Sequence, residues 1–549
     1  MLAVAMAAMA APAPAAQVQH DFDPATLAQY LSLRFSSAVP PIVIQHALAA
    51  EGFSQRDLDL VAASPSGSGG SSAAGAASPA ALDPAVSFAQ PISRDTLLCP
   101  SSDPTPCELD TQVEPDIAVN PANADNLVGV FQQGRFQDGG SVDPGWATTF
   151  DGGKTWPFHG DAPKLTVAVG GGFARASDPA VAFDRKHKAV LFNTIAVSVK
   201  GCAIFCDSAL VVNPSSNGGR TFGAPVVLHE DSSDPNGNTF VFNDKNWIVT
   251  DNNPGSPHYG RTYVAWDQVR CAEPTCTAVT QPVVLRYSDD GGKTWSPLIQ
   301  ATADEQPGSA HQRVGVQPVV EPNGHVVISY ADAGPSAFTF EGTYKAIRST
   351  DGGNTWSAPG LIDGADPAAE EANGLRAPNI PTMVGDGGGK LYLVFQDQRF
   401  GHGRNDIALE TSTDEGQTWS PAVNATPGEL ALDHFTPAVA VAAGRVHLTY
   451  RTHTPTNVNA DPTVHAVYRA LTTAGAPSGA PLELYAPSDA SVAAFSTLAG
   501  QRFRFFGDYA GIAASSTAAH PIWDHSQNFA GQSANPTNTH QRSFSARVQ

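Results

Sequence analysis

The stretch Ser349-Thr-Asp-Gly-Gly-Asn-Thr-Trp356 decides the fold of this chain, because its pattern occurs five times. Written generally, the pattern is S/T-x-D/N-x-G-x-T-W/F. The other copies are Thr149–Trp156 (TFDGGKTW), Ser215–Phe222 (SSNGGRTF), Ser288–Trp295 (SDDGGKTW) and Ser412–Trp419 (STDEGQTW). Their Asp or Asn positions, 151, 217, 290, 351 and 414, are 66, 73, 61 and 63 residues apart. A motif that recurs at a nearly constant period indicates a repeat architecture.

The chemistry of the pattern is that of a hairpin turn. The Asp side chain accepts hydrogen bonds from backbone N–H groups that follow it, Gly supplies positive-φ positions, and the aromatic ring closes over the turn. The pattern resembles the Asp box (BNR repeat) of sialidases and related β-propellers. This resemblance implies four-stranded antiparallel blades around an axis, with the box as a structural turn that takes no part in catalysis.

The composition favours one large all-β domain. The chain has 549 residues with 50 Gly and 44 Pro, and short runs of Val, Thr and aromatic residues lie between turn signals. Many short strands separated by turns are typical of an all-β protein, and a repeat array of this length can form a single domain. The formal charge of −21 and the lack of a Lys/Arg cluster argue against nucleic acid or an anionic membrane as the partner.

Motifs of several other enzyme classes do not occur in the sequence. There is no HExxH pair for zinc, no G-x-S-x-G nucleophile turn and no phosphate-binding loop. The segment from Asp231 to Asn238 (DSSDPNGN) carries oxygen ligands, but it lacks the spacing and terminal Glu of an EF-hand loop. We therefore predict no cofactor, with a Ca²⁺ site at that segment as the alternative.

The cysteines and the N-terminus both indicate an oxidising compartment. Three local cysteine pairs without C-x-x-C spacing predict three disulfides, and the pairs are Cys99/Cys107, Cys202/Cys206 and Cys271/Cys276. The first residues, MLAVAMAAMAAPAPAAQ, are apolar and end in small residues, as in a secretory signal, although a basic n-region is missing. No other stretch of the sequence is long and apolar enough to span a membrane. We expect a secreted or periplasmic monomer.

The composition divides the chain into four segments. Residues 1–19 resemble a signal peptide, and residues 20–62 have mixed helical character that fits a helical or disordered pro-segment. Residues 63–84 are a low-complexity linker rich in Ser, Gly and Ala. Residues 85–549 contain the Asp-box propeller, so the partly helical part is a short N-terminal appendage.

Within the propeller, units of about 60–70 residues each predict four antiparallel strands, as in a blade. The units begin near residues 114, 178, 244, 317, 378, 436 and 508. The sixth has Leu471–Pro477 where a box is expected, and a strand near Val86–Asp95 completes the seventh, so that the ring has no free edge. We predict seven blades, with six as the alternative; the sialidases that the motif resembles have six.

The order of strands in a blade indicates where a site lies. The box joins strands three and four on the face where strand one turns into strand two, so the opposite face collects the starts of the inner strands and the ends of the second strands. In the family that the motif resembles, this non-box face carries the active site. At these positions we predict a catalytic group of Glu114, Asp116, Asp244, Asp508 and Tyr509. A substrate-binding group is predicted from Asp178, Lys245, Asp267, Asp397, Arg399, Arg451, Asp524 and His525.

Two kinds of chemistry fit these residues. A glycosidase needs one carboxylic acid for the leaving oxygen and a second carboxylate, and like-charged neighbours raise the pKa of one of them. The sialidase resemblance implies instead a Tyr nucleophile and three Arg side chains that grip the substrate carboxylate. Tyr509, paired with Asp508 or Glu114, matches the nucleophile. Arg399 and Arg451 match two of the three Arg positions.

The chain departs from the sialidase pattern in two places. Where that family has a Phe/Tyr-Arg-Ile-Pro motif ahead of the first blade, this chain has Ile92-Ser-Arg-Asp95. A third gripping Arg is not evident, because Arg270, Arg376 and Arg504 match it poorly. The resemblance therefore extends to the fold more than to the catalytic motifs.

These observations predict a secreted glycoside hydrolase that acts on an anionic or complex glycan at the non-box face, in the manner of an exo-sialidase. A non-catalytic propeller that binds a glycan or a protein at the same face is the alternative, because the Arg motif is missing. A polysaccharide lyase is a third interpretation, with His525 or Tyr509 as its base.

Overall fold

The computed structural model describes the propeller region of the chain, with breaks at several loops. The described residues are 85–100, 105, 107–198, 208–231, 240–271, 279–303, 313–332, 343–364, 374–400, 403–429, 431–498, 501–529 and 538–549. The signal-like segment, the predicted helices of residues 20–62 and the linker at 63–84 lie outside these residues.

The structure repeats a unit of four antiparallel strands. In the unit that carries the central box motif, the strands β15 (Arg313–Val320), β16 (Val326–Asp332), β17 (Thr343–Ser349) and β18 (Gly360–Gly364) pair in chain order. Successive residues of β16 enter two different cores, as the period of two in a strand requires. Val327 packs with the following sheet, whereas Val326 and Ile328 pack with the preceding one. Each sheet is therefore apolar on both faces because it lies between two others.

The remaining strands fall into four larger sheets and one small one. One sheet contains β10 (Phe240–Thr250), β11 (Thr262–Cys271), β12 (Val279–Thr280), β13 (Val283–Ser288) and β14 (Ile299–Gln300). The next contains β20 (Thr382–Gly385), β21 (Leu391–Asp397), β22 (Asp406–Ser412) and β23 (Val423–Asn424). Another contains β24 (Asp433–Ala442), β25 (Arg445–His453), β26 (Thr463–Thr472), β27 (Leu482–Glu483) and β28 (Ser488–Asp489).

The largest sheet has twelve strands and includes both ends of the described chain. Its strands are β1 (Val86–Pro91), β2 (Cys107–Asn120), β3 (Asn123–Phe136), β4 (Ser141–Thr149), β5 (Phe158–Asp161), β6 (Arg175–Asp184), β7 (Ala189–Val197), β8 (Ser208–Ser215), β9 (Val226–Glu230), β31 (Gly511–Ala514), β32 (Ala519–Ser526) and β33 (Gln541–Val548). The small sheet contains β19 (Leu375–Arg376), β29 (Ala494–Leu498) and β30 (Gln501–Phe505). Two 3-10 turns, η1 (Val167–Val169) and η2 (Ala490–Val492), complete the described elements.

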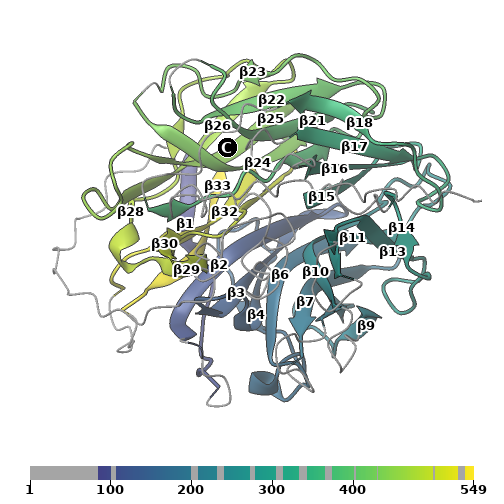
Figure 1. Ribbon diagram of the computed structural model, residues 1–549, viewed down its shortest axis with the longest axis horizontal. Helices are drawn as coiled ribbons and strands as arrows, with labels where there is room; N and C mark the ends of the chain where they lie inside the picture. Colours follow the sequence, from purple (N-terminus) through teal and green to yellow (C-terminus); the bar gives the residue numbers. More distant parts are fainter. Residues whose placement is uncertain are drawn as a thin grey trace, which may run out of the picture.

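The sheets are arranged around a central axis as an all-β propeller (Figure 1). The strands β2, β6, β10, β15 and β24 lie on the inside, and β9, β14, β18 and β23 lie at the rim (Figure 1). The twelve-stranded sheet is held together at two places by single residue pairs, Thr111 with Gln541 and Ser141 with Ala176. The prediction of an all-β propeller is confirmed.

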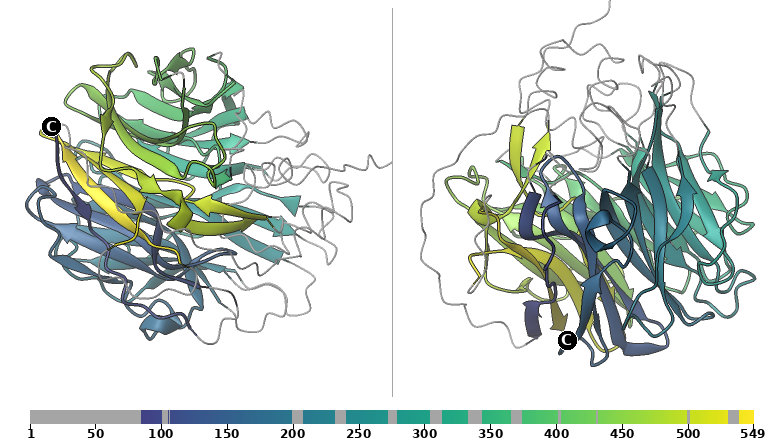
Figure 2. Two further views of the ribbon diagram at one scale, coloured as in Figure 1. Left: turned by 90° about the vertical axis from the view of Figure 1, so that its left-hand side faces the viewer. Right: turned by 90° about the horizontal axis from the view of Figure 1, so that it is seen from below.

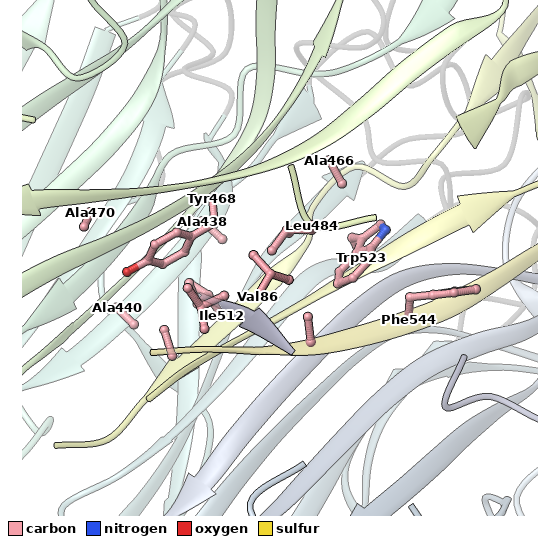
Figure 3. Close-up of a cluster of buried hydrophobic side chains, with 13 residues drawn as sticks. Val86, Ala438, Ala440, Ala466, Tyr468, Ala470, Leu484, Ile512, Trp523 and Phe544 are labelled. Carbon is pink, nitrogen blue, oxygen red and sulfur yellow. The ribbon is translucent and has the colours of Figure 1, made fainter. Parts of the chain in front are cut away.

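The two ends of the described chain close the ring together. β1 pairs antiparallel with β33, with Val86 opposite Val548, and Figure 2 shows the purple N-terminal strand beside the yellow C-terminal one. A buried cluster joins these strands to the sheet of β24, with Val86 and Trp523 on one side and Tyr468 on the other (Figure 3). The predicted strand near residues 86–95 therefore occurs as β1.

The Asp boxes form hydrogen-bonded turns. In the copy at Ser349–Trp356, Ser349 Oγ donates to Asp351 Oδ1 at 2.8 Å, and this bond recurs in all five boxes. Asp351 Oδ1 also accepts from Thr355 N at 2.9 Å, and its Oδ2 accepts from Thr355 Oγ1 at 2.7 Å. Arg261 Nη1 of the preceding sheet donates to Gly352 O at 2.9 Å. The box thus stabilises its own hairpin and also contacts the neighbouring sheet, which confirms its structural role.

One of the three predicted disulfides lies within the described residues. Cys99 and Cys107 are bonded, which confirms that pair. Cys202, Cys206 and Cys276 fall outside the described residues. In the part of the chain that the structure describes, no helix has the length and apolar character needed to cross a membrane.

Candidate functional site

The innermost strands share a backbone irregularity just ahead of their axial segments. β2, β6, β10, β15 and β24 each contain a β-bulge in which two residues face one on the partner strand. The first bulge residue has a positive φ in each case, namely Glu114 (57°), Asp178 (50°), Lys245 (44°), Gly315 (74°) and Thr436 (51°). This conformation costs a non-glycine residue about 1–2 kcal/mol. Bulges commonly re-aim a side chain beside a functional site, and three of these residues are charged.

Those three residues meet two others at the axis. Glu114, Asp178, Lys245, Asp508 and Tyr509 form what we call the axial cluster, and their exposed fractions are only 0–4%. They come from β2, β6, β10 and the segment between β30 and β31. The starts of the inner strands were predicted to line one site, and the structure brings these five predicted residues together.

The carboxyl groups of the axial cluster are linked by amide and hydroxyl groups. Glu114 Oε2 accepts a hydrogen bond from Gln132 Nε2, and Glu114 Oε1 accepts from Asp508 N at 3.3 Å. Gln132 Nε2 also donates to Ser177 Oγ at 3.0 Å, and Ser177 Oγ donates to Asp178 Oδ1 at 2.6 Å. Asp178 Oδ2 has no hydrogen-bond partner among the described residues. One carboxylate oxygen of the axial cluster is therefore buried without a hydrogen bond from the described part of the protein.

The cation of the axial cluster lies between two aromatic rings. Lys245 Nζ is 3.6 Å from the centre of the Tyr509 ring and 4.6 Å from that of Trp247. Its ammonium group has no hydrogen-bond partner within the described part of the chain. Tyr509 OH points elsewhere and donates to Pro179 O at 3.1 Å. A cation held by ring faces keeps its N–H donors available for a hydroxyl or carboxylate of a ligand.

Two arginines border the axial cluster. Arg376 Nε and Nη2 donate to the two oxygens of Asp508 at 2.8 and 2.7 Å, and both side chains of this pair are fully buried. The guanidinium groups of Arg376 and Arg135 lie 5.3 and 5.1 Å from the centre of the Phe505 ring. Phe505 belongs to β30, so the β29–β30 hairpin packs on this side of the cluster.

Burial and like charges shift the pKa values of the axial cluster. Burial raises the pKa of Glu114 well above its usual range, and the carboxyls of Asp178 and Asp508 add to the effect. Burial also raises the pKa of Asp178, although Lys245 opposes it, and raises that of Tyr509. Burial lowers the pKa of Lys245. These shifts favour the protonated form of the Glu114 carboxyl.

Asp116 connects the axial cluster to a channel along the axis. This channel has a volume of about 600 Å³, and Asp116, Trp247 and Gln317 contribute to its lining. Asp116 Oδ2 accepts from Val181 N at 2.9 Å. Burial raises the pKa of Asp116 to about 6. The predicted residue Asp116 therefore lines the channel.

Arg399 and Arg451 were predicted to grip a substrate carboxylate, but their guanidinium groups are held elsewhere. Arg399 pairs with Asp363 of the neighbouring sheet and with Asp397, where Nη2 and Oδ2 are 2.6 Å apart. Arg451 Nη1 donates to Asp524 O at 2.9 Å, and its Nη2 donates to Phe506 O at 3.2 Å. Both arginines therefore connect neighbouring sheets, and their contacts do not place two guanidinium groups beside Tyr509.

The predicted residues Asp244 and Asp267 lie directly opposite each other on β10 and β11. Asp244 Oδ1 accepts from the backbone N–H of Lys245 at 3.0 Å. Asp267 Oδ2 accepts from Gln281 Nε2 at 2.7 Å, and burial raises the pKa of Asp267 well above its usual range. Asp244 and Asp267 therefore lie beside Lys245 in the same sheet.

Asp524 and His525 lie in the last part of the twelve-stranded sheet. Asp524 Oδ1 accepts from Ser543 Oγ at 2.7 Å, and burial raises the pKa of Asp524 to about 7. The His525 ring centre is 4.9 Å from that of Phe544, and His525 Nδ1 is 3.0 Å from Ser488 Oγ. Burial lowers the pKa of His525 to about 4. This histidine is part of an aromatic core within the sheet.

The alternative Ca²⁺ segment is described at its first residue only. Asp231 Oδ2 accepts from Asn243 Nδ2 at 2.9 Å and from Gln268 Nε2 at 2.8 Å. It also lies 2.8 Å from His229 Nε2. Residues 232–239 lie outside the described residues. This carboxylate is therefore occupied by three side chains of the protein.

The sequence did not point to several members of the site. Gln132 and Arg135 lie at the end of β3, after its apolar segment Leu127–Phe131, and a position at the end of a second strand is the signal that selected Asp397 and Arg399. Applied to the first unit, that signal would have found them. Arg376 lies ahead of β20 and reaches Asp508 through the small β19–β30 sheet, for which the sequence has no local pattern.

A comparison with family models identifies the repeat. Residues 168–429 match the model of the BNR repeat-like domain. This part of the chain is similar to a BNR repeat-like domain. No curated protein sequence matches the chain.

Several solved structures are similar to this chain at low sequence identity. A Hadza microbial sialidase is 15% identical, with 67% of each chain covered and a TM-score of 0.42. The intramolecular trans-sialidase of Ruminococcus gnavus is 14% identical over 70% of this chain and 99% of its own, with a TM-score of 0.43. An α-L-arabinanase of Penicillium chrysogenum is 15% identical over 68% of this chain and 94% of its own, with a TM-score of 0.42.

Proposed function

We propose that the protein is a glycoside hydrolase whose catalytic groups lie in the axial cluster. The observation that carries this proposal is the carboxyl of Glu114, which has a raised pKa and lies next to Asp178 and Asp508. Glycoside hydrolysis needs a protonated acid on one side of the bond and a carboxylate on the other. Like charges held together in a buried site separate the pKa values of such a pair.

Within this proposal, we give each residue a role that is consistent with its contacts. Glu114 is the general acid, and Gln132 fixes one of its oxygens. Asp178 is the second carboxylate, because its Oδ2 has no partner among the described residues. Lys245 binds a hydroxyl or carboxylate of the substrate, which favours an anionic or complex glycan. Glu114, Asp178 and Lys245 each have a positive φ, and backbone strain of this kind is concentrated at functional sites.

This proposal uses two carboxylates in place of the Tyr nucleophile that the sialidase resemblance implies. Tyr509 OH donates a hydrogen bond to Pro179 O, and burial raises the pKa of Tyr509. The ammonium group of Lys245 lies over the face of the Tyr509 ring. The two predicted gripping arginines are paired with other groups. Cleavage of a sialic acid by the Tyr-based route would require these contacts to break.

The test is turnover of a glycan panel that includes sialylated, uronate-containing and neutral substrates. Glu114→Gln and Asp178→Asn should each lower kcat by about 10³-fold, because each removes one proton-transfer group. Asp414→Asn is the matched control, since it removes a carboxylate from a box turn, and it should keep full activity. Thermal melting of each variant checks that the fold is intact. Full activity of folded Glu114→Gln would reject the assignment.

A non-catalytic propeller that binds a glycan is the second candidate. The burial of the axial cluster favours it, because Phe505 packs over Arg376 and Arg135 and the cluster residues are nearly unexposed. Binding to an immobilised glycan array without release of any sugar would support this candidate. A polysaccharide lyase would instead release an unsaturated product that absorbs in the near ultraviolet.

We also infer a ring of seven blades in a secreted or periplasmic monomer. The single residue pairs within the twelve-stranded sheet support the blade count, since they divide it into three groups of four strands. Four further sheets then bring the number to seven. The Cys99–Cys107 disulfide supports an oxidising compartment.

A further inference from the structure

The channel along the axis has an apolar wall. One residue from each innermost strand contributes to it, and these residues are Ile117, Val181, Val249, Val319, Met383, Val439 and Ile512. The volume of about 600 Å³ is in the range of about 300–1,000 Å³ that is typical of small-molecule sites. An apolar wall of this size suits the hydrocarbon part of a ligand.

The mouth of the channel lies among the turns after β10, β15 and β20, at the box end of the axis. Glu321 and Asp251 line this mouth together with the amides of Asn252 and Asn253. No Lys or Arg is among the residues that line the described channel. The mouth is therefore acidic and amide-rich, in contrast to the wall below it.

Glu321 carries an oxygen that faces no protein donor. Its side chain is only 2% exposed, and Oε1 has no hydrogen-bond partner among the described residues. A buried carboxylate oxygen left in this state lacks a stabilising hydrogen bond. A donor from a ligand in the mouth would supply that interaction.

The charges around Glu321 favour a cationic donor. Burial raises the pKa of Glu321 to about 7, and the carboxyls of Glu415 and Asp386 act in the same direction, while His325 opposes them. Glu415 is itself paired with His325 and Arg348. A cation in the mouth would lie near several carboxyl groups and would stabilise the ionised form of Glu321.

We propose that this channel binds an organic cation with an apolar body, in the manner of a primary alkylammonium ion. The ammonium group donates to Glu321 Oε1 and lies near Asp251 at the mouth, and the hydrocarbon chain extends along the apolar wall. This site is at the opposite end of the axis from the axial cluster, so it does not depend on the proposed hydrolase activity.

The experiment measures binding of hexylammonium to the full chain by titration calorimetry. Methylammonium lacks the apolar body and hexanoate lacks the positive charge, so both should bind at least about tenfold more weakly. Glu321→Gln should weaken hexylammonium binding by about tenfold or more, because it removes the charged acceptor. Asp125→Asn removes an exposed carboxylate near the start of β3 and should leave binding unchanged.

Three results would overturn the proposal. Equal binding of hexylammonium and hexanoate would show that the site does not select a cation, and equal binding of methylammonium would show that the wall plays no part. No binding of hexylammonium to the wild-type protein would reject the site altogether. The ligand comparison uses only the wild-type chain, so it remains decisive if Glu321→Gln fails to fold.

Discussion

The Asp-box turns and the axial cluster both contain aspartate side chains, but the pKa values of these side chains shift in opposite directions. In the box, burial alone would raise the pKa of Asp351, but hydrogen bonds from Thr355, Ser349 and Asn354 outweigh it and hold the pKa at about 2. In the axial cluster, burial outweighs the hydrogen bonds, and the pKa of Asp178 rises. The comparison teaches that a recurrent carboxylate which satisfies its own turn is a structural group, whereas a buried carboxylate with an open oxygen is a candidate for chemistry.

The largest effect on stability is expected at the buried ion pair of the axial cluster. Arg376→Ala leaves the Asp508 carboxylate buried without its bidentate partner, so the free energy of unfolding should fall by about 3–5 kcal/mol. Urea unfolding followed by fluorescence measures this change. Arg399→Ala is the matched control, because its ion pairs are partly exposed, and it should cost less than about 1 kcal/mol. Equal losses in both variants would contradict the distinction between buried and partly exposed pairs.

A change of pH is expected to have an intermediate effect on the free energy of unfolding. Burial raises the pKa of Glu108 from 4.5 to about 7, so the folded state retains a proton that the unfolded state loses as the pH rises above 4.5. The free energy of unfolding should therefore be highest below about pH 4.5, fall by roughly 3 kcal/mol for this group up to pH 7, and then level off. Asp116 and Asp524 have raised pKa values and act with the same sign.

Melting temperatures between pH 4.5 and 8 measure the decline, and Glu108→Gln should make it shallower. Asp351 provides the contrast, because its pKa is lowered and its stabilising contribution is lost only below about pH 4. A Glu108→Gln variant whose melting temperature depends on pH in the same way as that of the wild-type protein would contradict the raised pKa of Glu108.

The smallest effect is expected in the box. Asp351→Ala removes the acceptor of the Thr355 hydrogen bonds and should destabilise the protein by about 1–2 kcal/mol. Asp351→Asn should cost less than about 1 kcal/mol, because the second box has Asn217 at this position and keeps the bond to Thr221 N at 3.1 Å. Chemical unfolding of the two variants separates these values. A loss of several kcal/mol in Asp351→Asn would mean that charge, rather than acceptor geometry, sustains the turn.

Much of the fold follows from local sequence. The box residues contact one another within eight positions, so their spacing reveals a turn without knowledge of distant contacts. The alternation of apolar residues likewise predicts strands such as β16 and β21. The pairing of β1 with β33 was also predictable, because a ring that lacks one outer strand needs an additional strand to close it.

The site could be predicted only in part. Residues at the starts of the inner strands converge because the propeller brings those starts together, and this placed Glu114 and Lys245 at one predicted site. The partners of Arg399 and Arg451 depend on which side chains lie on the adjacent sheet, and a single strand carries no information about them. Arg376 was judged a poor match for the same reason, since its contact with Asp508 spans 132 residues.

The pairing of β1 with β33 has a consequence for the synthesis of the protein. Ser87 and Arg547 are hydrogen-bonded across a separation of 460 residues, so the last strand must leave the ribosome before the ring can close. Contacts of such long range form slowly, because much of the chain must first be ordered. Until then, β1 and the outer edge of the incomplete unit expose unpaired backbone groups, which are the usual starting point of strand-to-strand aggregation. The nascent chain is therefore prone to aggregation for as long as β33 has not been made.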